Sequence, residues 1–296
     1  MSSILVLGSA NLDLVVRQPR IARPGETMFG TAFSTVPGGK GLNQAVAAAR
    51  AGADVGFLGA VGDDEFGRRL RTQLETDGID TTGLATVDQP TGTAHIAVTD
   101  DGENSIVVVS GANHVQVALD DTMRSAIEGA RTLVLQLERP VSLVAEALAY
   151  AQAHGVRTVL TPAPVAPLPS DLLALVTVLV PNAREACELA GVDDEFAAAR
   201  ILGEQGSTVI ITRGSRGVLV LEPGGEPRVL PAVVVEPVDT TGAGDTFTGA
   251  LCAWLAEDAS LDDAIRAGQV AAAISVTRPG ATSAMPGRSE ILAALG

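Results

Sequence analysis

The stretch NQAVAAARAGADVGFLGAVGDDEFGRRLRTQLETDG, residues 43 to 78, contains a helix, a strand and a second helix in succession. Residues 43–52 and 64–78 have the pattern of helices, and each ends at a glycine, a residue that commonly follows the last helical turn. Residues 54–62 form a short apolar run that is typical of a strand. Helices alternating with a strand in this way favour a sheet whose strands run mainly parallel.

The same alternation continues along most of the chain. Further helices are predicted at 141–155 and 183–191, and further strands at 4–11, 132–138, 156–162, 176–182 and 208–214. The pattern predicts an α/β fold, a doubly wound and mainly parallel sheet with helices on both faces. Sheets of this kind bind ligands at the carboxyl ends of their strands, where this sequence places Asn11, Glu138, Asn182 and Thr212.

Two segments depart from this rhythm. Residues 12–36 and 84–109 alternate apolar with polar or small residues and contain turn signals, the pattern of half-buried antiparallel strands. We expect them to form a small second sheet that acts as a lid on a single domain spanning 1–296. The exposed edges of such a sheet are a liability unless they are paired, so we expect a homodimer that pairs its lids.

The composition excludes several classes of protein. No apolar run reaches the roughly 20 residues of a membrane span, and the N-terminus lacks the basic region of a signal peptide, so a cytoplasmic location is expected. A net charge of −15 argues against nucleic-acid or anionic membrane partners. The two cysteines, Cys187 and Cys252, lie far apart in helical patterns, which favours buried thiols over a disulfide or a zinc site.

The segment DTTGAGDTF, 239–247, precedes a helix predicted to bury one apolar stripe. Glycines at a helix N-terminus expose successive N–H groups, so Gly242, Ala243 and Gly244 predict an anion hole. Asp245 has two interpretations: a residue that only favours the helix dipole, or a general base for a hydroxyl that attacks a phosphate. Because positioning dominates catalysis of phosphoryl transfer, such a base needs no raised pKa.

Three more segments carry polar groups at turns, and each has a structural alternative. PGGKGLN, 37–43, is not a Walker A loop; it is either a tight turn or a close backbone approach to a ligand aided by Lys40 and Asn43. Asn182 and Glu185 form either a capping box or a pair near Mg²⁺, held through water. TRGSRG, 212–217, is either a hairpin turn or a phosphate contact.

Together these motifs resemble the ribokinase-like family of carbohydrate kinases along essentially the whole chain. The resemblance rests on residues 38–67 and 238–251, supported by VLGSANLD, SGAN, LQLE, PNAREA and ITRGSRG in the family's order. It implies ATP-dependent phosphorylation of D-ribose at O5, with Mg²⁺ bound to ATP. The alternatives are a kinase for deoxyribose, fructose, ketodeoxygluconate or a nucleoside, and a non-catalytic binding regulator on the same fold.

The resemblance also implies roles for particular residues. Asp245 would be the base, and the 242–244 amides would hold the γ-phosphate. The sugar would contact Asn11, Asp13, Gly39, Lys40, Asn43 and Glu138. ATP would lie along Asn182, Thr212, Gly214, Ser215, Gly217, Gly244 and Gln269. An activating K⁺ would be bound by Asp239 and by the carbonyls of Thr241, Ser275, Arg278 and Gly280.

The sequence departs from the family pattern at two positions. Ala284 stands where a serine ligand for K⁺ is common, so the cation site would be incomplete or completed by water. The family's NPAP motif is TPAP here, with Thr161 as its first residue, and the sequence alone gives that change no explanation.

Overall fold

A computed structural model describes residues 3–115, 118–169 and 171–296, and its main element is a nine-stranded sheet with the order β13-β12-β11-β10-β9-β8-β1-β4-β5. In this order, the seven neighbouring strands β11, β10, β9, β8, β1, β4 and β5 are parallel to one another. At one edge of the sheet, β12 pairs antiparallel with β11, and β13 pairs antiparallel with β12. The sheet consists of β1 (Ile4–Leu7), β4 (Val55–Gly62), β5 (Leu84–Val87), β8 (Thr132–Leu135), β9 (Arg157–Leu160), β10 (Val178–Leu179), β11 (Thr208–Thr212), β12 (Val218–Leu221) and β13 (Arg228–Leu230). The predicted mainly parallel sheet is confirmed.

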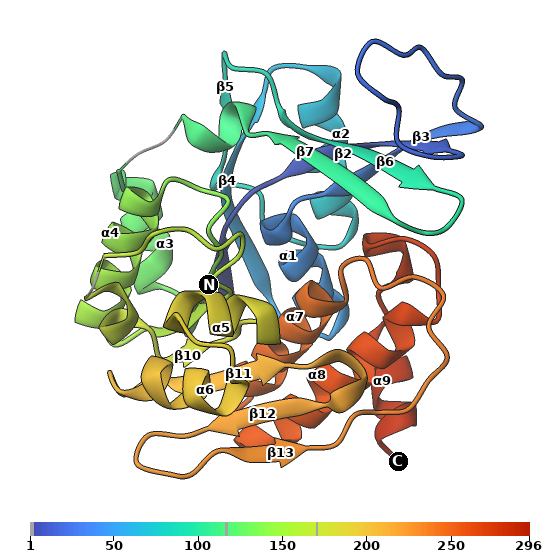
Figure 1. Cartoon of the computed structure of the whole chain (residues 1–296). Helices are drawn as coiled ribbons and strands as arrows, with labels where there is room; N and C mark the ends of the chain where they lie inside the picture. The colour runs from blue at the N-terminus through green and yellow to red at the C-terminus, as the bar shows by residue number, and fades with distance from the viewer. Residues whose placement is uncertain (1–2, 116–117, 170) are drawn as a thin grey trace.

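Helices cover both faces of this sheet (Figure 1). Alternate side chains of β1 show the two layers, because Ile4 and Val6 belong to one hydrophobic cluster and Leu5 and Leu7 to the other. The first cluster includes α1 (Lys40–Arg50), α2 (Glu65–Thr76), α7 (Ala243–Ala256), α8 (Leu261–Val276) and α9 (Arg288–Leu295). The second includes α3 (Asp121–Glu128), α4 (Val141–Ala153), α5 (Ala183–Ala190) and α6 (Glu195–Gly203).

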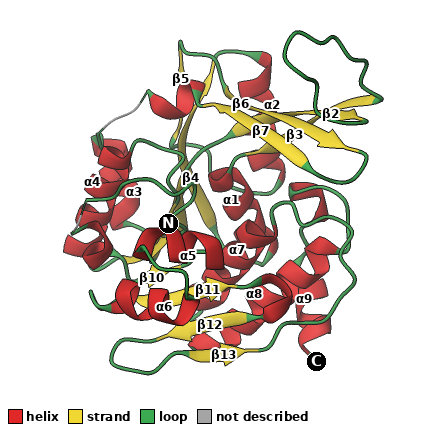
Figure 2. Ribbon diagram, viewed as in Figure 1, coloured by secondary structure: helices red, strands yellow, loops and turns green. Residues whose placement is uncertain are grey.

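A separate four-stranded sheet has the order β3-β2-β6-β7 and lies beyond α1, at the upper right of Figure 2. It consists of β2 (Asn11–Gln18), β3 (Ala32–Gly38), β6 (Gly92–Thr99) and β7 (Asn104–Val109). The prediction that residues 84–109 all belong to the small sheet is therefore wrong for the first residues, because β5 pairs in parallel with β4 in the main sheet. An edge strand with one buried face has the same alternating pattern as a strand of the small sheet.

Helix α7 is buried more completely than its sequence pattern predicted. Every residue from Asp245 to Ala256 is buried, rather than a single stripe, because α7 packs between α1 and α8. Gly249 permits the close contact with α1, since a Cβ there would lie 2.5 Å from the Cβ of Ala47 and 2.6 Å from the carbonyl oxygen of Gln44. This contact fixes the position of the α7 N-terminus relative to α1.

The two cysteines are free thiols. Cys252 is buried in α7, and burial raises its pKa to about 12, whereas Cys187 in α5 is only half-buried. Within the described ranges, no helix combines the length and the apolar character needed to cross a bilayer.

Candidate active site

Asp245 lies in the first turn of α7 and is held by two side chains of α1. Asn43 donates from Nδ2 to Asp245 Oδ2 at 3.0 Å, and Gln44 donates from Nε2 to Oδ1 at 2.9 Å. The residue is only 8% exposed. Each carboxylate oxygen keeps lone pairs beyond the one that accepts an amide, so this carboxylate can still accept a further hydroxyl.

Burial raises the pKa of Asp245, although the Lys40 charge and the hydrogen bonds from Asn43 and Gln44 oppose the shift. The Asp245 charge in turn raises the pKa of Lys40 against burial, with Glu138 and Glu185 adding to the effect. Lys40 therefore lies within electrostatic range of three carboxylates. The raised pKa makes Asp245 a better proton acceptor than the sequence argument required.

The residues predicted to bind the sugar lie around the same point. Glu138 follows β8, and its Oε2 accepts from the backbone N–H of Lys40 at 3.0 Å and from the hydroxyl of Ser9. Burial raises the pKa of Asp13 to about 7, helped by the charges of Glu138 and Asp245. The structure thus brings Asp13, Lys40, Asn43, Glu138 and Asp245 together.

Asn11 is oriented by a residue that the sequence analysis did not assign to the site. Asn113 donates from Nδ2 to Asn11 Oδ1 at 2.8 Å and accepts from Ala10 N–H at 3.0 Å through its own Oδ1. The Asn11 amide nitrogen is thereby turned away from Asn113. Gly39 begins α1 at φ +90°, and a Cβ there would lie 2.9 Å from the backbone nitrogen of Asn11, so the crossing of these segments requires glycine.

The N-terminus of α7 lacks a side-chain cap. Gly242 adopts a left-handed conformation with φ +72° at the N-cap position. Ala243 N–H donates to the carbonyl of Thr240 at 3.2 Å, so one of the three amides predicted to form the anion hole is engaged in a turn. Within the described part of the chain, the amides of Gly242 and Gly244 have no hydrogen-bond acceptor and are available to an anion.

Asn182 and Glu185 form the capping box that was one of the two sequence interpretations. Asn182 Oδ1 accepts from Glu185 N–H at 2.8 Å, and Glu185 Oε2 accepts from Asn182 N–H at 2.8 Å. A β-bridge pairs Asn182 with Thr212, so these two predicted nucleotide contacts are neighbours. The cap uses only one oxygen of the Glu185 carboxylate, which leaves the second for other partners.

The other predicted nucleotide contacts lie on and behind the β11–β12 turn. Gly214 and Ser215 are part of a short 3-10 helix, Gly214–Arg216, and are exposed at the turn. Gly217 ends that turn at φ +85°, where a Cβ would lie 2.1 Å from the carbonyl oxygen of Leu230. Gln269 donates to the carbonyl of Pro231 at 2.9 Å, so its side chain supports the segment that follows β13.

Asp239 links the two segments that were predicted to bind K⁺. Its Oδ1 accepts from Thr241 N–H at 2.9 Å, and its Oδ2 accepts from Gly280 N–H at 2.8 Å. Partial burial acts to raise the pKa of Asp239, but the hydrogen bonds from Thr241 and Gly280 outweigh it and the pKa lies below its usual value. Asp239 N–H also donates to Val276 at the end of α8, which brings Ser275 and Arg278 into the same region. Ala284 is fully buried nearby in the 3-10 helix Thr282–Ala284.

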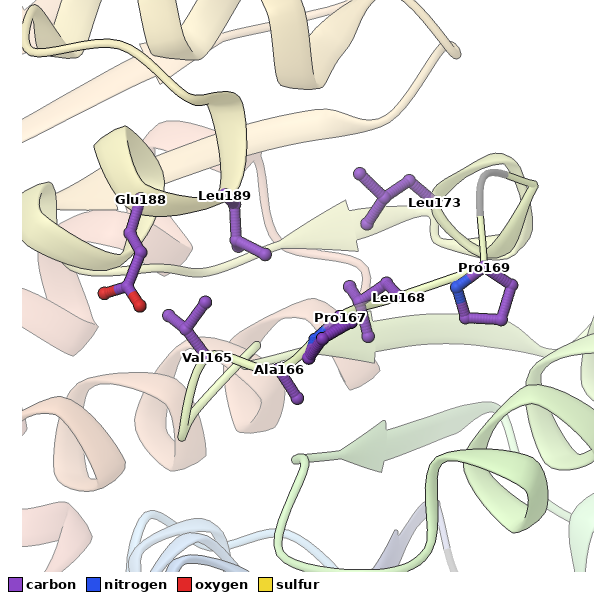
Figure 3. A pocket seen from close by; sticks show the side chains of 8 residues that line it. All are labelled: Val165, Ala166, Pro167, Leu168, Pro169, Leu173, Glu188 and Leu189. Atoms are coloured by element: carbon purple, nitrogen blue, oxygen red, sulfur yellow. The ribbon is translucent and has the colours of Figure 1, made fainter.

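A second feature is a pocket lined by other residues, whose side chains Figure 3 shows. Its lining is mostly apolar and contains none of the residues predicted for catalysis or for binding sugar, nucleotide or metal. It is lined by Val165, Ala166, Pro167, Leu168, Pro169, Leu173, Glu188 and Leu189. Polar groups suited to a sugar or a phosphate are concentrated instead at the N-termini of α1 and α7.

A model of the pfkB family of carbohydrate kinases matches residues 1–288. The chain belongs to this family. It is 44% identical to the ribokinase of Haemophilus influenzae over 98% of this chain and 97% of that protein. It is 36% identical to the deoxyribokinase of Salmonella typhi over 96% of this chain and 95% of that protein. The fold matches the structure of Arabidopsis thaliana ribokinase complexed with ribose and ATP with a TM-score of 0.94 at 31% identity, covering 99% of this chain and 98% of that chain.

These matches confirm the family resemblance, the α/β fold and the sugar kinase class. The sequence analysis nevertheless missed polar residues that contact the predicted site, namely Gln44 and Asn113. A buried glutamine in an otherwise Ala-rich and apolar helix was the available signal for Gln44, since such an amide needs partners in the core. Asn113 was quoted only as part of the SGAN motif and was given no role.

Proposed function

We propose that this pfkB family member is an ATP-dependent kinase that phosphorylates D-ribose at O5. The observation that carries the proposal is a buried carboxylate, Asp245, in the first turn of a helix whose glycine amides are free to bind an anion. Full-length relatives named ribokinase support the choice of sugar.

The sugar would be held by groups that the protein leaves partly unsatisfied. Asn43 Oδ1 is buried and has no hydrogen-bond partner among the described residues, so a sugar hydroxyl would satisfy it. Asp13, once ionised, can accept from two hydroxyls at once. The Asn11 amide nitrogen and the Lys40 ammonium would add hydrogen-bond donors. A polyhydroxylated ligand with adjacent hydroxyls fits this set of donors and acceptors.

In the chemical step, the O5 hydroxyl attacks the γ-phosphorus of ATP and Asp245 accepts its proton. The new O5–P bond forms as the bond from the γ-phosphorus to the bridging oxygen of ADP breaks. The amides of Gly242 and Gly244 donate to the γ-phosphoryl oxygens, where negative charge is spread in a loose transition state. Asp245 is held by Asn43 and Gln44, so the base is already positioned before the substrates bind.

Mg²⁺ and K⁺ fit the residues assigned to them. Mg²⁺ with ATP would be held near Glu185, whose second carboxylate oxygen is outside the capping box, and through water, because Mg²⁺ retains several of its waters. K⁺ would be held by Asp239 with the carbonyls of Thr241, Ser275, Arg278 and Gly280, without a ligand from Ala284. Bound there, the cations would neutralise phosphate charge.

The small sheet would act as the lid of this site and as a dimer contact. The lid comprises 12–36 and 92–109, and its outer strand β7 exposes Ile106, Val107, Val108 and Val109, each at least 48% exposed. An apolar edge strand favours pairing with a second copy. In equilibrium ultracentrifugation, Val108→Lys would dissociate the dimer, whereas Val229→Lys on β13, a site of 45% exposure, would not. A monomeric parent protein would refute this contact.

A second candidate is a kinase for another sugar, because the chain is also similar to a deoxyribokinase. The test is ADP release with Mg–ATP and D-ribose, deoxyribose, fructose, ketodeoxygluconate or adenosine, each with and without K⁺. We expect ribose to give the highest kcat/KM, and K⁺ to raise it. A preference for another sugar would overturn the proposed substrate, and the absence of ADP release with every compound would overturn the kinase activity and favour the regulator.

A further inference from the structure

A chain of side-chain amides reaches the Oδ1 oxygen of Asp245. Gln44 donates from Nε2 to Asp245 Oδ1 at 2.9 Å and to the hydroxyl oxygen of Thr161 at 3.3 Å. Its own Oε1 accepts from Nε2 of Gln136 at 2.7 Å. Every hydrogen-bonding direction of the Gln44 amide, both N–H bonds and the oxygen, therefore has a partner.

These residues come from three separate elements and are shielded from water. Gln44 is in α1, Gln136 directly follows β8 and Thr161 directly follows β9. Gln44 and Gln136 are each 1% exposed and Thr161 is 9% exposed. In a buried site no water replaces a lost partner, so losing one of these hydrogen bonds leaves a polar group unsatisfied at a cost in free energy.

Asp245 and Gln136 together decide which way the Gln44 amide faces. Because Gln136 donates to Oε1, the Nε2 of Gln44 must point to Asp245. A flipped Gln44 would place its oxygen against the carboxylate and its N–H groups against another N–H donor. Both changes would replace an attraction with a repulsion.

We propose that Gln136 and Gln44 form an amide relay that positions Asp245 and fixes its oxygen Oδ1, leaving the other side of the carboxylate to the sugar hydroxyl. Gln44 and Gln136 are positioning residues in this proposal, because they act on the reaction only through Asp245. The relay rests on the proposed role of Asp245 as base. It also explains Thr161, the first residue of TPAP, whose hydroxyl accepts the second N–H of Gln44.

The amide donor of Gln44 and the positive charge of Lys40 both favour the ionised form of Asp245. Two nearby carboxylates oppose it. The charged groups within range of Asp245 are Lys40 from α1, Glu138 after β8 and Asp13 from β2. None of these is altered when Gln44 or Gln136 is replaced. A change in the titration of the base would then report the lost amide donor.

The test uses Gln44→Met, Gln136→Met and the double variant in the full-length enzyme with Mg–ATP and D-ribose. Methionine has similar length and cannot donate. For Gln44→Met we expect a roughly tenfold lower kcat and an acid limb of kcat moved up by about one pH unit, since a donor to a charged carboxylate is lost. For Gln136→Met we expect a smaller shift in the same direction, with the ribose KM nearly unchanged in both.

The double variant distinguishes a relay from two independent structural effects. A relay predicts that Gln136→Met adds little when Gln44 is already Met, whereas independent sites would add. Unchanged kcat and acid limb in both single variants, or full additivity, would overturn the relay. Thr161→Val, which loses only the hydroxyl, is the alternative variant if Gln44→Met fails to fold, and it is expected to lower kcat with the same direction of pH shift.

Asp245→Asn separates this inference from the function on which it rests. An active Asp245→Asn enzyme would refute the proposed base itself. An inactive one, combined with normal pH profiles in the glutamine variants, would refute only the relay.

Discussion

The N-termini of α5 and α7 use their first-turn groups in opposite ways. In α5, Asn182 and Glu185 satisfy each other's backbone N–H groups, so the helix end is closed by its own side chains. In α7, Gly242 has no capping side chain, and Asp245 points instead to Asn43 and Gln44 of α1. Both helices have a dipole, so the proposed phosphate site at α7 differs from the α5 N-terminus in its free first-turn N–H donors.

The largest effect should follow from changing the carboxylate of α7. Asp245→Asn removes the proton acceptor while keeping the size of the side chain, so we expect kcat to fall by roughly 10²- to 10⁴-fold. Sugar affinity should change little, because the remaining sugar contacts are untouched. Steady-state kinetics with D-ribose and Mg–ATP measure both quantities, and a near-normal kcat would remove Asp245 from its role.

Asp13 tests whether burial and the neighbouring carboxylates Glu138 and Asp245 disfavour its ionised form. Its pKa is raised from 3.8 to about 7 in the folded protein, so the folded state favours the protonated form. The stabilisation is complete below the unfolded pKa and is lost as the pH rises towards about 7. Urea unfolding of the free enzyme should show a loss on the order of 3 kcal/mol between pH 4 and 7. The Asp13→Asn variant should lose much less unfolding free energy over this pH range. An equal loss in the variant and the parent protein would contradict the raised pKa of Asp13.

Gly242 and Gly244 test the open helix end with a matched pair. Gly242→Ala places a Cβ at φ +72° and 3.2 Å from the Cβ of Ala281, so we expect a loss of about 1 to 2 kcal/mol in the free energy of unfolding. At Gly244 a Cβ meets no described atom within 4 Å, so Gly244→Ala should keep its stability. If phosphate occupies that open space, Gly244→Ala should still raise the KM for ATP, and an unchanged KM would place the phosphate elsewhere.

Asn182 tests the closed helix end and should give the smallest effect. Asn182→Ala removes the cap of α5 and should cost about 1 kcal/mol of unfolding free energy, whereas Asn182→Asp keeps the acceptor and should restore it. Thermal unfolding measures both variants. If the Asn182 amide also contacts ATP, the ATP KM will rise in both variants, which would show that the closed end takes part in binding.

Local patterns predicted the elements of the fold and the two glycine clusters because their causes lie within a few residues. The alternation of strands and helices predicted the parallel sheet. The spacing of Asn182 and Glu185 predicted, as one of two interpretations, the capping box that the structure shows at α5. β5 was misplaced because the alternation at 84–87 does not say which sheet receives the strand. The full burial of α7 was missed because it depends on packing between α1 and α8.

The surroundings of the base depended on contacts between distant parts of the chain. Gln44 and Gln136 lie 92 residues apart in sequence, and Gln44 and Asp245 lie 201 apart, so no local pattern joins them. Asn113 reaches Asn11 over a separation of 102 residues. The sequence could therefore single out Asp245 as a candidate base, but the side chains that contact its carboxylate could be identified only from the three-dimensional packing.

The roles of the two helix N-termini are best compared by assaying Asp245→Asn and Asn182→Ala side by side. The claim is that the open N-terminus of α7 supplies the base and the anion hole, whereas the Asn182 cap at the N-terminus of α5 is structural. We predict a kcat at least roughly a hundredfold lower for Asp245→Asn with little loss of thermal stability. Asn182→Ala should show the reverse, a lower unfolding temperature with kcat within a few fold of the parent. A large loss of kcat in Asn182→Ala together with near-normal kcat in Asp245→Asn would contradict these roles.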